Sequence, residues 1–156
     1  MNKITDKLNN VLADTYTLYL KTQNYHWNVT GFTFDSLHQL FGRQYTELAL
    51  AVDEIAERLR ALGVLAPATF KEFGELKSIK EGKANLSAEE MLEDLRSSHE
   101  QVVQTAKLAL DIASKEKDDF TVDMLTQRIG AHQKEAWMIS ATLAGKPSSL
   151  TLKEVS

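Results

Sequence analysis

The sequence predicts an all-α protein, a four-helix bundle formed by one domain over residues 1–156. Apolar residues recur at intervals of three and four along four long segments, and strand signals are absent. The links between these segments are short, long and short, which is typical of a bundle with one crossover connection. A chain of 156 residues is also long enough to bury a sizeable core within a single domain.

The first two helices are predicted on either side of a short turn. The first covers residues 4–29 and ends where Gly31 interrupts the apolar pattern. The second begins near Thr33 or Asp35, either of which has a side chain suited to an N-cap, and it ends at Gly63. Both segments carry one apolar face, so we expect them to pack against each other and against the rest of the bundle.

The long link that follows is expected to be the crossover connection. Over residues 63–86 the apolar pattern weakens and proline and glycine recur, although residues 68–73 are compatible with a short extra helix. The third long helix begins at a capping box, in which the Ser87 hydroxyl and the Glu90 carboxylate each accept from the other residue's backbone amide. Its apolar face continues to Ala113.

The fourth helix follows a polar run over residues 114–119. Its apolar positions continue to Leu143, and the glycine at Gly145 with the proline at Pro147 predicts its end. Two short links and one long link therefore connect four helices.

Composition excludes several classes of function. The formal net charge is −4, with 22 acidic and 18 basic residues, so nucleic acid is not the default partner. The absence of cysteine excludes disulfides, thiolate zinc sites, iron–sulfur clusters and cysteine nucleophiles. Charged residues stand where a signal peptide needs an apolar run, and no stretch has the length of a membrane span. We therefore expect a cytoplasmic protein.

Two histidines and two carboxylates form a candidate metal site. Asp53 and Glu57 are four residues apart, so a helix places both on one face. His38 precedes Asp53 by fifteen positions on the same predicted helix, which separates them by roughly 22 Å. One chain therefore cannot bring His26 and His38 to these carboxylates, whereas an antiparallel second copy in a twofold dimer can. Mixed imidazole and carboxylate ligands suit iron, manganese or zinc better than magnesium or calcium.

Plainer interpretations of the same residues stay open. Asp53 and Glu57 on a helix surface most often belong to a solvated face, where Arg58 or Arg60 is a candidate partner of Glu57. His26 is also compatible with a hydrogen-bonded interface residue that binds no metal. His99 and His132 fall within helical patterns as single imidazoles, and we assign neither a role.

Three segments carry a resemblance to a known family. Residues 25–31, 37–38 and 51–58 resemble the ferroxidase signature of the Dps family, the miniferritins or DNA-binding proteins from starved cells. The resemblance spans nearly the whole chain, including residues 69–73 and 115–125. It implies a ferritin-like fold and a hollow dodecamer of identical subunits. Such shells oxidise Fe(II), with hydrogen peroxide in preference to oxygen, store the ferric mineral and protect against oxidative damage.

The resemblance also implies a role for each candidate ligand. His26 and His38 come from one subunit, and Asp53 and Glu57 come from its twofold mate. His26, Asp53 and Glu57 hold the tighter iron position, while Glu57 bridges toward a weaker position near His38. Zinc or manganese are possible substitutes for iron. Ordinary di-iron ferritins instead use Glu-x-x-His motifs inside each bundle, and this sequence contains none, so an intrachain centre is not expected.

One position departs from the family pattern. The family usually has Asp or Glu four residues after the second histidine, whereas this chain has Gly42, followed by Arg43. Water, Gln39 or Asp35 are candidate substitutes for the missing ligand. We expect one firm metal position and slower oxidation. The alternative is a cage with a structural or DNA-compacting role and a degenerate centre, and a third possibility is a dimeric bundle that binds zinc.

The resemblance implies further roles for Trp27, Asp119 and Asp123, and each of these residues also has a plainer explanation. Trp27 matches an aromatic residue that intercepts radicals near the centre, although interface packing explains it equally well. Asp119 and Asp123 match residues that line an iron-entry pore, although acidic residues at a helix start are also ordinary partners of the helix dipole. A further pore aspartate of the family is Ser114 here.

DNA binding is expected to be weak or absent despite the family name. Many members use a lysine-rich tail for multiple phosphate contacts. This chain has only Lys3 and Lys7 near its start, and Lys146 and Lys153 near its end. Repetition over a dodecamer raises the avidity of such contacts, but two lysines at each end are few.

Overall fold

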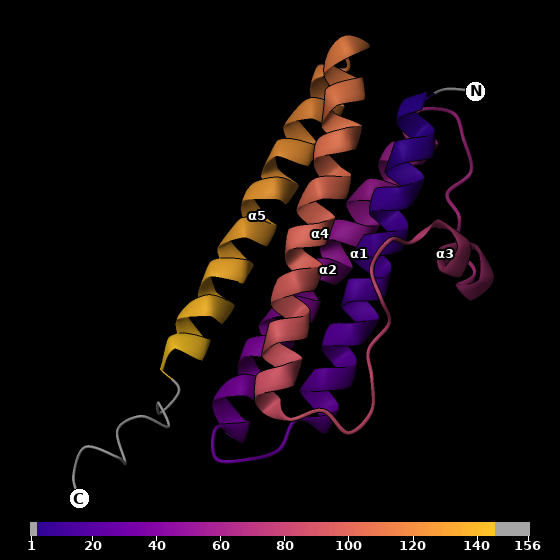
Figure 1. Cartoon of the computed structure of the whole chain (residues 1–156). Helices are drawn as coiled ribbons and strands as arrows, with labels where there is room; N and C mark the ends of the chain where they lie inside the picture. Colours follow the sequence, from indigo (N-terminus) through magenta and orange to yellow (C-terminus); the bar gives the residue numbers. More distant parts are fainter. Residues whose placement is uncertain (1–2, 146–156) are drawn as a thin grey trace, which may run out of the picture.

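The structure is a computed structural model that describes residues 3–145, and it confirms the all-α prediction (Figure 1). Within this range every regular element is a helix. None of the helices is both long and apolar enough to cross a membrane. The five helices are α1 (Lys3–Asn28), α2 (Phe34–Ala61), α3 (Phe70–Leu76), α4 (Ala88–Lys115) and α5 (Asp119–Ala144).

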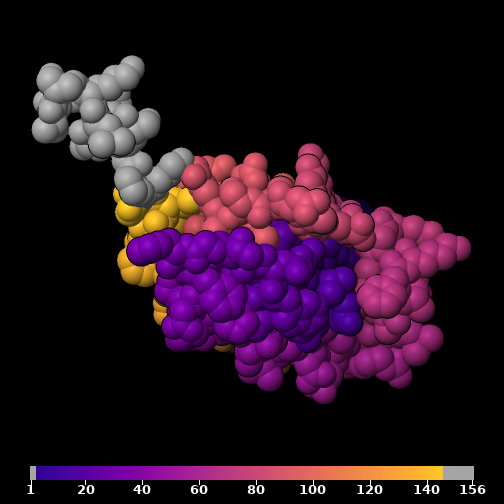
Figure 2. All heavy atoms as spheres, turned by 90° about the horizontal axis from the view of Figure 1, so that it is seen from below, coloured from indigo at the N-terminus to yellow at the C-terminus, as the bar shows by residue number. Residues whose placement is uncertain are grey.

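The four long helices form two antiparallel hairpins. Helix α1 packs against α2, α4 packs against α5, and the two hairpins meet mainly through α1 and α4. The crossover from α2 to α4 runs along the outside of α1, and α3 lies within it (Figure 1). In the space-filling view the crossover protrudes on one side of the bundle (Figure 2). This is the four-helix bundle with one long crossover and a short extra helix that the sequence predicts.

Local signals explain most of the helix ends. At the start of α4 the Ser87 Oγ accepts from the Glu90 amide at 3.1 Å, and Glu90 Oε2 accepts from the Ser87 amide at 2.7 Å. The predicted capping box is therefore confirmed. Thr33 stands at the N-cap of α2 but its side chain makes no capping hydrogen bond, and its ψ of 20° departs from the extended backbone of most caps. Gly145 follows α5, while Pro147 lies outside the described residues.

The apolar core consists of two clusters that lie toward opposite ends of the bundle. One gathers where α1 begins and α2 ends, and the other gathers around the α1–α2 turn and the start of α4. The largest fully buried apolar side chains of the first cluster are Ile4, Leu8, Leu12, Ile55, Leu59 and Leu125, and those of the second are Leu18, Tyr25, Phe41, Leu48 and Leu95.

A buried carboxylate fastens the crossover to the bundle. Asp14 of α1 is fully buried and accepts hydrogen bonds from the Ser78 amide at 2.6 Å and the Ser78 hydroxyl at 2.7 Å. It also accepts from the Ile79 amide at 3.2 Å and from the Thr105 hydroxyl of α4 at 2.8 Å. One side chain thus connects the crossover to two helices, and each of these bonds satisfies a polar group that would otherwise be costly to bury.

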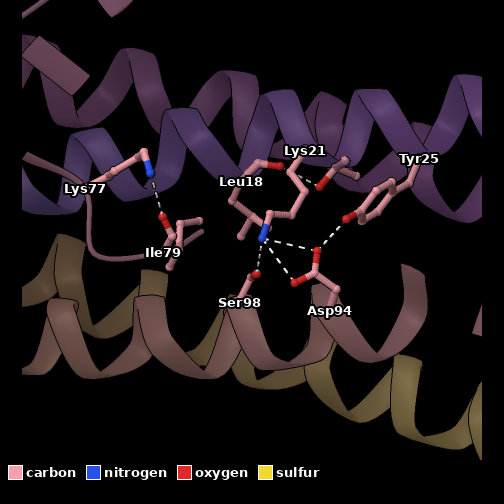
Figure 3. A network of polar contacts seen from close by, with 8 residues as sticks. Leu18, Lys21, Tyr25, Lys77, Ile79, Asp94 and Ser98 are labelled. Carbon is pink, nitrogen blue, oxygen red and sulfur yellow. Dashed lines mark hydrogen bonds and ion pairs between the residues drawn. The ribbon is translucent and has the colours of Figure 1, made fainter. Parts of the chain in front are cut away.

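A buried lysine makes the second connection between α1 and α4 (Figure 3). The Lys21 ammonium lies 3.3 Å from the Asp94 carboxylate and donates to the Ser98 hydroxyl at 2.9 Å. The Tyr25 hydroxyl donates to the same carboxylate at 2.5 Å. Burial lowers the pKa of Lys21 although Asp94 acts in the opposite direction, and burial with the Asp94 bond raises the pKa of Tyr25. The cation therefore depends on Asp94 to remain in a site that is largely shielded from water.

Replacement of Lys21 tests the strength of this connection. Lys21→Met leaves Asp94 without its cation and should lower the free energy of unfolding by about 3 kcal/mol. Lys107→Met on the exposed side of α4 is the matched control, and it should change that free energy by no more than about 0.5 kcal/mol. Urea unfolding followed by circular dichroism measures both, and equal midpoints for the two variants would show that the buried pair adds no stability.

Candidate metal centre

The turn between α1 and α2 brings the two candidate histidines together. His26 lies near the end of α1 and His38 lies in the second turn of α2. Their imidazole rings stack with centroids 3.7 Å apart and an interplanar angle of 14°. The two imidazoles therefore come together within one chain.

Reciprocal hydrogen bonds define which ring nitrogen of each histidine donates. His26 Nδ1 lies 2.6 Å from the His38 carbonyl oxygen, and His38 Nδ1 lies 2.7 Å from the His26 carbonyl oxygen. A carbonyl oxygen only accepts, so each Nδ1 carries the proton and donates. In the neutral rings each Nε2 then keeps a free lone pair, which is the arrangement by which backbone carbonyls orient metal-binding histidines. Both side chains are only partly buried, so a metal ion can reach them.

Aromatic side chains enclose the histidine pair on two sides. The Phe34 ring stacks on His38 at a centroid distance of 5.1 Å, and the Tyr45 ring meets His26 edge-on, also at 5.1 Å. Trp27 is 61% exposed. The sequence analysis did not identify Tyr45 as a neighbour of His26, because the two residues lie on different helices.

Gly42 occupies the position directly beside the His26 ring. A Cβ atom at this position would lie 3.1 Å from His26 Cε1 and 3.4 Å from His26 Nδ1, which is tighter than ordinary packing. The lack of a side chain thus allows the imidazole to rest against α2. An open groove of about 650 Å³ adjoins Gly42 and is also lined by Tyr45 and the exposed Arg43. Gly42 therefore has open space on the solvent side and a close contact on the histidine side.

The two side chains predicted as substitute ligands are hydrogen-bonded to each other. Gln39 Nε2 donates to Asp35 Oδ2 at 3.0 Å on the exposed surface of α2. Both side chains belong to the first turns of α2, on the same helix as His38. This hydrogen bond engages the Gln39 amide nitrogen and Asp35 Oδ2, so a metal ion would be met by Gln39 Oε1 or Asp35 Oδ1.

The two carboxylates lie farther along α2 than the histidines can reach. Asp53 and Glu57 are both exposed and one turn apart, near Leu50, which is 71% exposed. Because α2 is one continuous helix, His38 and Asp53 stay roughly 22 Å apart. Within residues 3–145 no three side chains of the metal-ligating types lie close enough together to hold an ion. One chain by itself therefore presents half of the candidate ligand set at each of two places.

The arginines that could neutralise Glu57 have other partners. Arg58 donates to the Asp118 carboxylate at 2.7 Å and lies over the Phe120 ring at 4.8 Å. Arg60 donates to the Val64 carbonyl oxygen at 3.1 Å. The interpretation in which these arginines pair with Glu57 thus finds no support among their observed contacts, and the solvated-face alternative stays open.

The bundle interior holds a second imidazole pair that sequence reasoning did not connect. His99 of α4 and His132 of α5 are buried, with their Nδ1 atoms 2.9 Å apart. Arg128 Nη2 donates to His132 Nε2 at 3.1 Å and forms an ion pair with Glu47 of α2. A neutral His132 therefore carries its proton on Nδ1 and donates to His99. The helical phase of both histidines predicts burial, but nothing local predicts that they meet.

The electrostatics of this interior pair disfavour an additional cation. Burial, with a smaller effect of Arg128, lowers the pKa of His99 to about 3. Burial also holds the pKa of His132 well below its ordinary value, with His99 and Arg128 acting in the same direction. Both rings are thus neutral at ordinary pH. The guanidinium of Arg128 already supplies the positive charge here, which favours a metal centre outside the bundle interior over one within it.

The proposed pore residues lie at the start of α5. Asp119 and Asp123 are exposed, and Asp123 accepts from the Gln127 side chain at 3.0 Å. Asp118 caps the helix by accepting from the Thr121 amide at 3.1 Å. These positions are consistent with an acidic surface, and a pore requires further copies of the chain.

Comparisons with known proteins agree with this architecture. The family model of the ferritin-like domain matches residues 5–146. The DNA protection during starvation protein 2 of Bacillus anthracis is 39% identical over 144 residues, which cover 92% of this chain and 99% of that protein. The crystal structure of Dps from Staphylococcus aureus superposes with a TM-score of 0.88 at 33% identity and covers 92% of this chain and 96% of the other.

A third similar structure carries a chemical description. The Dps protein of Vibrio cholerae, described as a member of a broad superfamily of ferritin-like diiron-carboxylate proteins, has a TM-score of 0.87 and 30% identity. It covers 90% of this chain and 89% of that chain. The similarity therefore extends over nearly the full length in both sequence and structure.

Substitution of Gly42 tests its contact with His26. Gly42→Ala should displace the imidazole and weaken Co(II) binding by about tenfold, as loss of outer-shell support does at other metal sites. Gly130→Ala on α5 is the matched control, because a Cβ there meets nothing within 4 Å. That control should stabilise the helix by up to about 1 kcal/mol and leave Co(II) affinity unchanged. Isothermal titration calorimetry gives both affinities, and equal values for the two variants would refute the role of this contact.

Proposed function

Because this chain belongs to the Dps proteins of the ferritin-like family, we propose that it oxidises Fe(II) in the cytoplasm and stores the ferric product within a shell of its own copies. Protection against starvation or oxidative stress follows from removing Fe(II) and peroxide together. Hydrogen peroxide is the preferred oxidant, with oxygen as the second choice.

The histidine pair is the observation that carries this proposal. Two imidazoles with their Nδ1 protons engaged by backbone carbonyls present their Nε2 lone pairs, which is what a divalent transition metal requires. Carboxylates and imidazoles together suit Fe(II), and the chain has no thiolate that would favour softer metals. Zinc and manganese suit the same ligand types and are the proposed competitors for iron.

The carboxylates of the centre come from a twofold mate. His26 and His38 would meet Asp53 and Glu57 of the second copy, since the rigid length of α2 prevents closure within one chain. In each centre Fe(II) is the substrate. Two Fe(II), one hydrogen peroxide and two protons give two Fe(III) and two water molecules, so the electrons and atoms balance.

Exposed apolar side chains support assembly into a larger shell. Single exposed apolar residues are ordinary, but this chain exposes large ones on each of the five helices. We propose a homododecamer, in which Asp119 and Asp123 of neighbouring copies line an iron-entry pore. Exposed large apolar side chains include Leu50, Leu65, Phe70, Leu108, Phe120 and Trp137.

Gly42 leads to one firm metal position per centre. A second ion near His38 lacks the carboxylate that this position usually supplies, and exposed Arg43 adds a positive charge beside the groove. Oxidation should therefore be slower than in relatives that carry the acidic residue. Iron-soaked crystals with two fully occupied ions at every centre would contradict this part of the proposal.

The shared centre is tested with two single variants and their mixture. His26→Ala and Asp53→Ala should each lower the rate of ferric absorbance after anaerobic addition of Fe(II) and peroxide by at least about tenfold, because each removes a ligand. Asp111→Ala, an exposed acidic residue of α4, is the control and should keep the wild-type rate.

Co-assembly of the two inactive variants distinguishes a shared centre from an intrachain one. Each mixed dimer contains one centre built from the intact histidines of one chain and the intact carboxylates of the other. A random mixture should therefore recover roughly a quarter of the wild-type activity, as a twofold interface requires. No recovery in verified mixed assemblies would refute the shared centre. Background rates in wild-type protein would instead favour the alternative cage, with a structural role and a degenerate centre.

DNA binding is proposed to be weak or absent. The net charge is −4, and the described surface offers no lysine-rich segment of the kind that makes many phosphate contacts. Linear DNA should run unshifted with the assembled protein in a gel-shift assay at physiological salt. Clear retardation that disappears as salt is raised would contradict this expectation and favour the DNA-compacting alternative.

A further inference from the structure

Helix α2 carries a row of exposed side chains along one side. Its members recur at intervals of four and three residues, which is the spacing by which two helices pack along a shared seam. The groove of about 650 Å³ beside Gly42 is lined by the first four of them. The members are Gln39, Arg43, Thr46, Leu50, Asp53 and Glu57, and we call them the outer row of α2. A second helix with the same spacing would therefore fit along this side.

Arg43 has no partner of opposite charge in its own chain. Its side chain is exposed, and within residues 3–145 it forms neither a hydrogen bond nor an ion pair. Glu47, one helical turn further along, would be its ordinary partner on a helix surface. Both oxygens of Glu47 instead accept from the Arg128 guanidinium. The charge of Arg43 is thus left for a group outside the chain.

The acidic end of the outer row lacks a cation in the same way. Asp53 and Glu57 lie one turn apart with Glu54 beside them, so three like charges share a short stretch of exposed surface. None of the three forms an ion pair with another described residue. Arg58 and Arg60, the nearest cations in sequence, are engaged elsewhere. Charges of opposite sign therefore stand unmatched toward the two ends of one row.

A twofold axis that passes α2 at the level of Leu48 matches these charges. In two antiparallel copies, Gln39, Arg43 and Thr46 then face Glu57, Asp53 and Leu50 of the partner subunit, in that order. The same register brings His38 nearly level with Glu57 of the partner subunit, as the shared centre requires. It also covers Leu50, which is 71% exposed in the single chain.

Charge selects this register over its neighbours. A shift of one heptad in either direction keeps the rows in contact but places Arg43 opposite Thr46 or Arg60 of the partner subunit. The first shift gives the guanidinium a neutral hydroxyl as its neighbour, and the second sets two cations against each other. Opposite charges across an interface favour association, whereas like charges oppose it. The register that the shared centre needs is therefore also the one that charge favours.

We propose that Arg43 forms an ion pair with Asp53 of the partner subunit and supplies, at each shared centre, the positive charge that a second Fe(II) would bring. This inference rests on the proposed function and adds to its centre a residue that positions a ligand. A guanidinium needs only one oxygen of a carboxylate for such a bond, so the other oxygen of Asp53 stays available to iron.

The charges at the centre explain how Arg43 limits it to one ion. Two neutral imidazoles and two carboxylates carry a charge that one Fe(II) cancels. With the Arg43 guanidinium in place the centre is then positive, and a second Fe(II) would have to approach against that charge. Gly42 withholds a ligand from the second position, whereas Arg43 acts through its charge. The two neighbouring residues thus act in the same direction by separate means.

Exchange of the two charges tests the ion pair without any metal. Arg43→Glu and Asp53→Lys each set like charges against each other, twice in every twofold interface, and each should raise the concentration at which the assembly dissociates by at least about tenfold. The double variant restores opposite charges and should recover most of the loss. Sedimentation velocity with a chelator present measures all three, and Lys107→Glu, at an exposed lysine of α4, is the control that should assemble like the wild type.

Removal of the charge alone tests the effect on metal binding. Arg43→Gln should bind a second Co(II) per centre at least about tenfold more tightly than the wild type does, because the opposing charge is gone. Lys107→Gln is the matched control and should keep the wild-type affinities. Equilibrium dialysis with metal analysis of the assembled proteins gives both the number of ions and their affinities.

The two measurements refute different parts of the proposal. A double variant that assembles no better than the single variants overturns the ion pair, and an unchanged second Co(II) affinity in Arg43→Gln overturns the role of its charge. The assembly measurement contains neither metal nor peroxide, so it does not depend on ferroxidase activity. Wild-type protein that shows the charge-exchange recovery but oxidises Fe(II) only at the buffer rate would refute the proposed function and support the ion pair.

Discussion

The stiffness of α2 is the constraint on which the candidate centre depends. A straight helix holds His38 and Asp53 roughly 22 Å apart, and no rearrangement of side chains closes that separation. The α1–α2 turn, in contrast, brings His26 against His38, and reciprocal hydrogen bonds hold the two rings together. Each chain thus offers a prepared pair of imidazoles at one place and a pair of carboxylates at another. Symmetry between two copies is the simplest way to unite them.

The polar contacts inside the bundle agree with a metal centre that lies outside it. Its central polar contacts consist of a neutral imidazole pair, an arginine and a glutamate, with the proton order running from Arg128 through His132 to His99. Two buried nitrogens of this group, His99 Nε2 and Arg128 Nε, have no hydrogen-bond partner among the described residues. The Arg128 guanidinium already places a positive charge in the bundle core, where other ferritin-like bundles hold their metal. The structural polar contacts therefore lie inside the bundle, and the proposed metal centre lies outside it.

Much of the fold was predictable from sequence because it depends on local signals. Apolar spacing located the four long helices, the Ser87 capping box located the start of α4, and weak periodicity marked the crossover. Long-range partners were not predictable in the same way. Lys21 falls in the apolar phase of α1, which hints at burial, but Asp94 lies 73 residues away. The candidate site divides likewise: residue types and spacing suggested the four ligands, whereas Tyr45 and the Gly42 contact required the packing of α2 against α1.

The way in which Asp14 and Lys21 hold the crossover and α4 bears on the order in which the chain folds. Contacts within the α1–α2 and α4–α5 hairpins join segments that are close in sequence, so little loop entropy opposes their early formation. The bonds of Asp14 and Lys21 span 64 to 91 residues and can form only when the hairpins dock. Both charges must lose their water at that moment. We therefore expect docking to be the slow step of folding and the transition state to contain preformed hairpins whose shared interface is still hydrated.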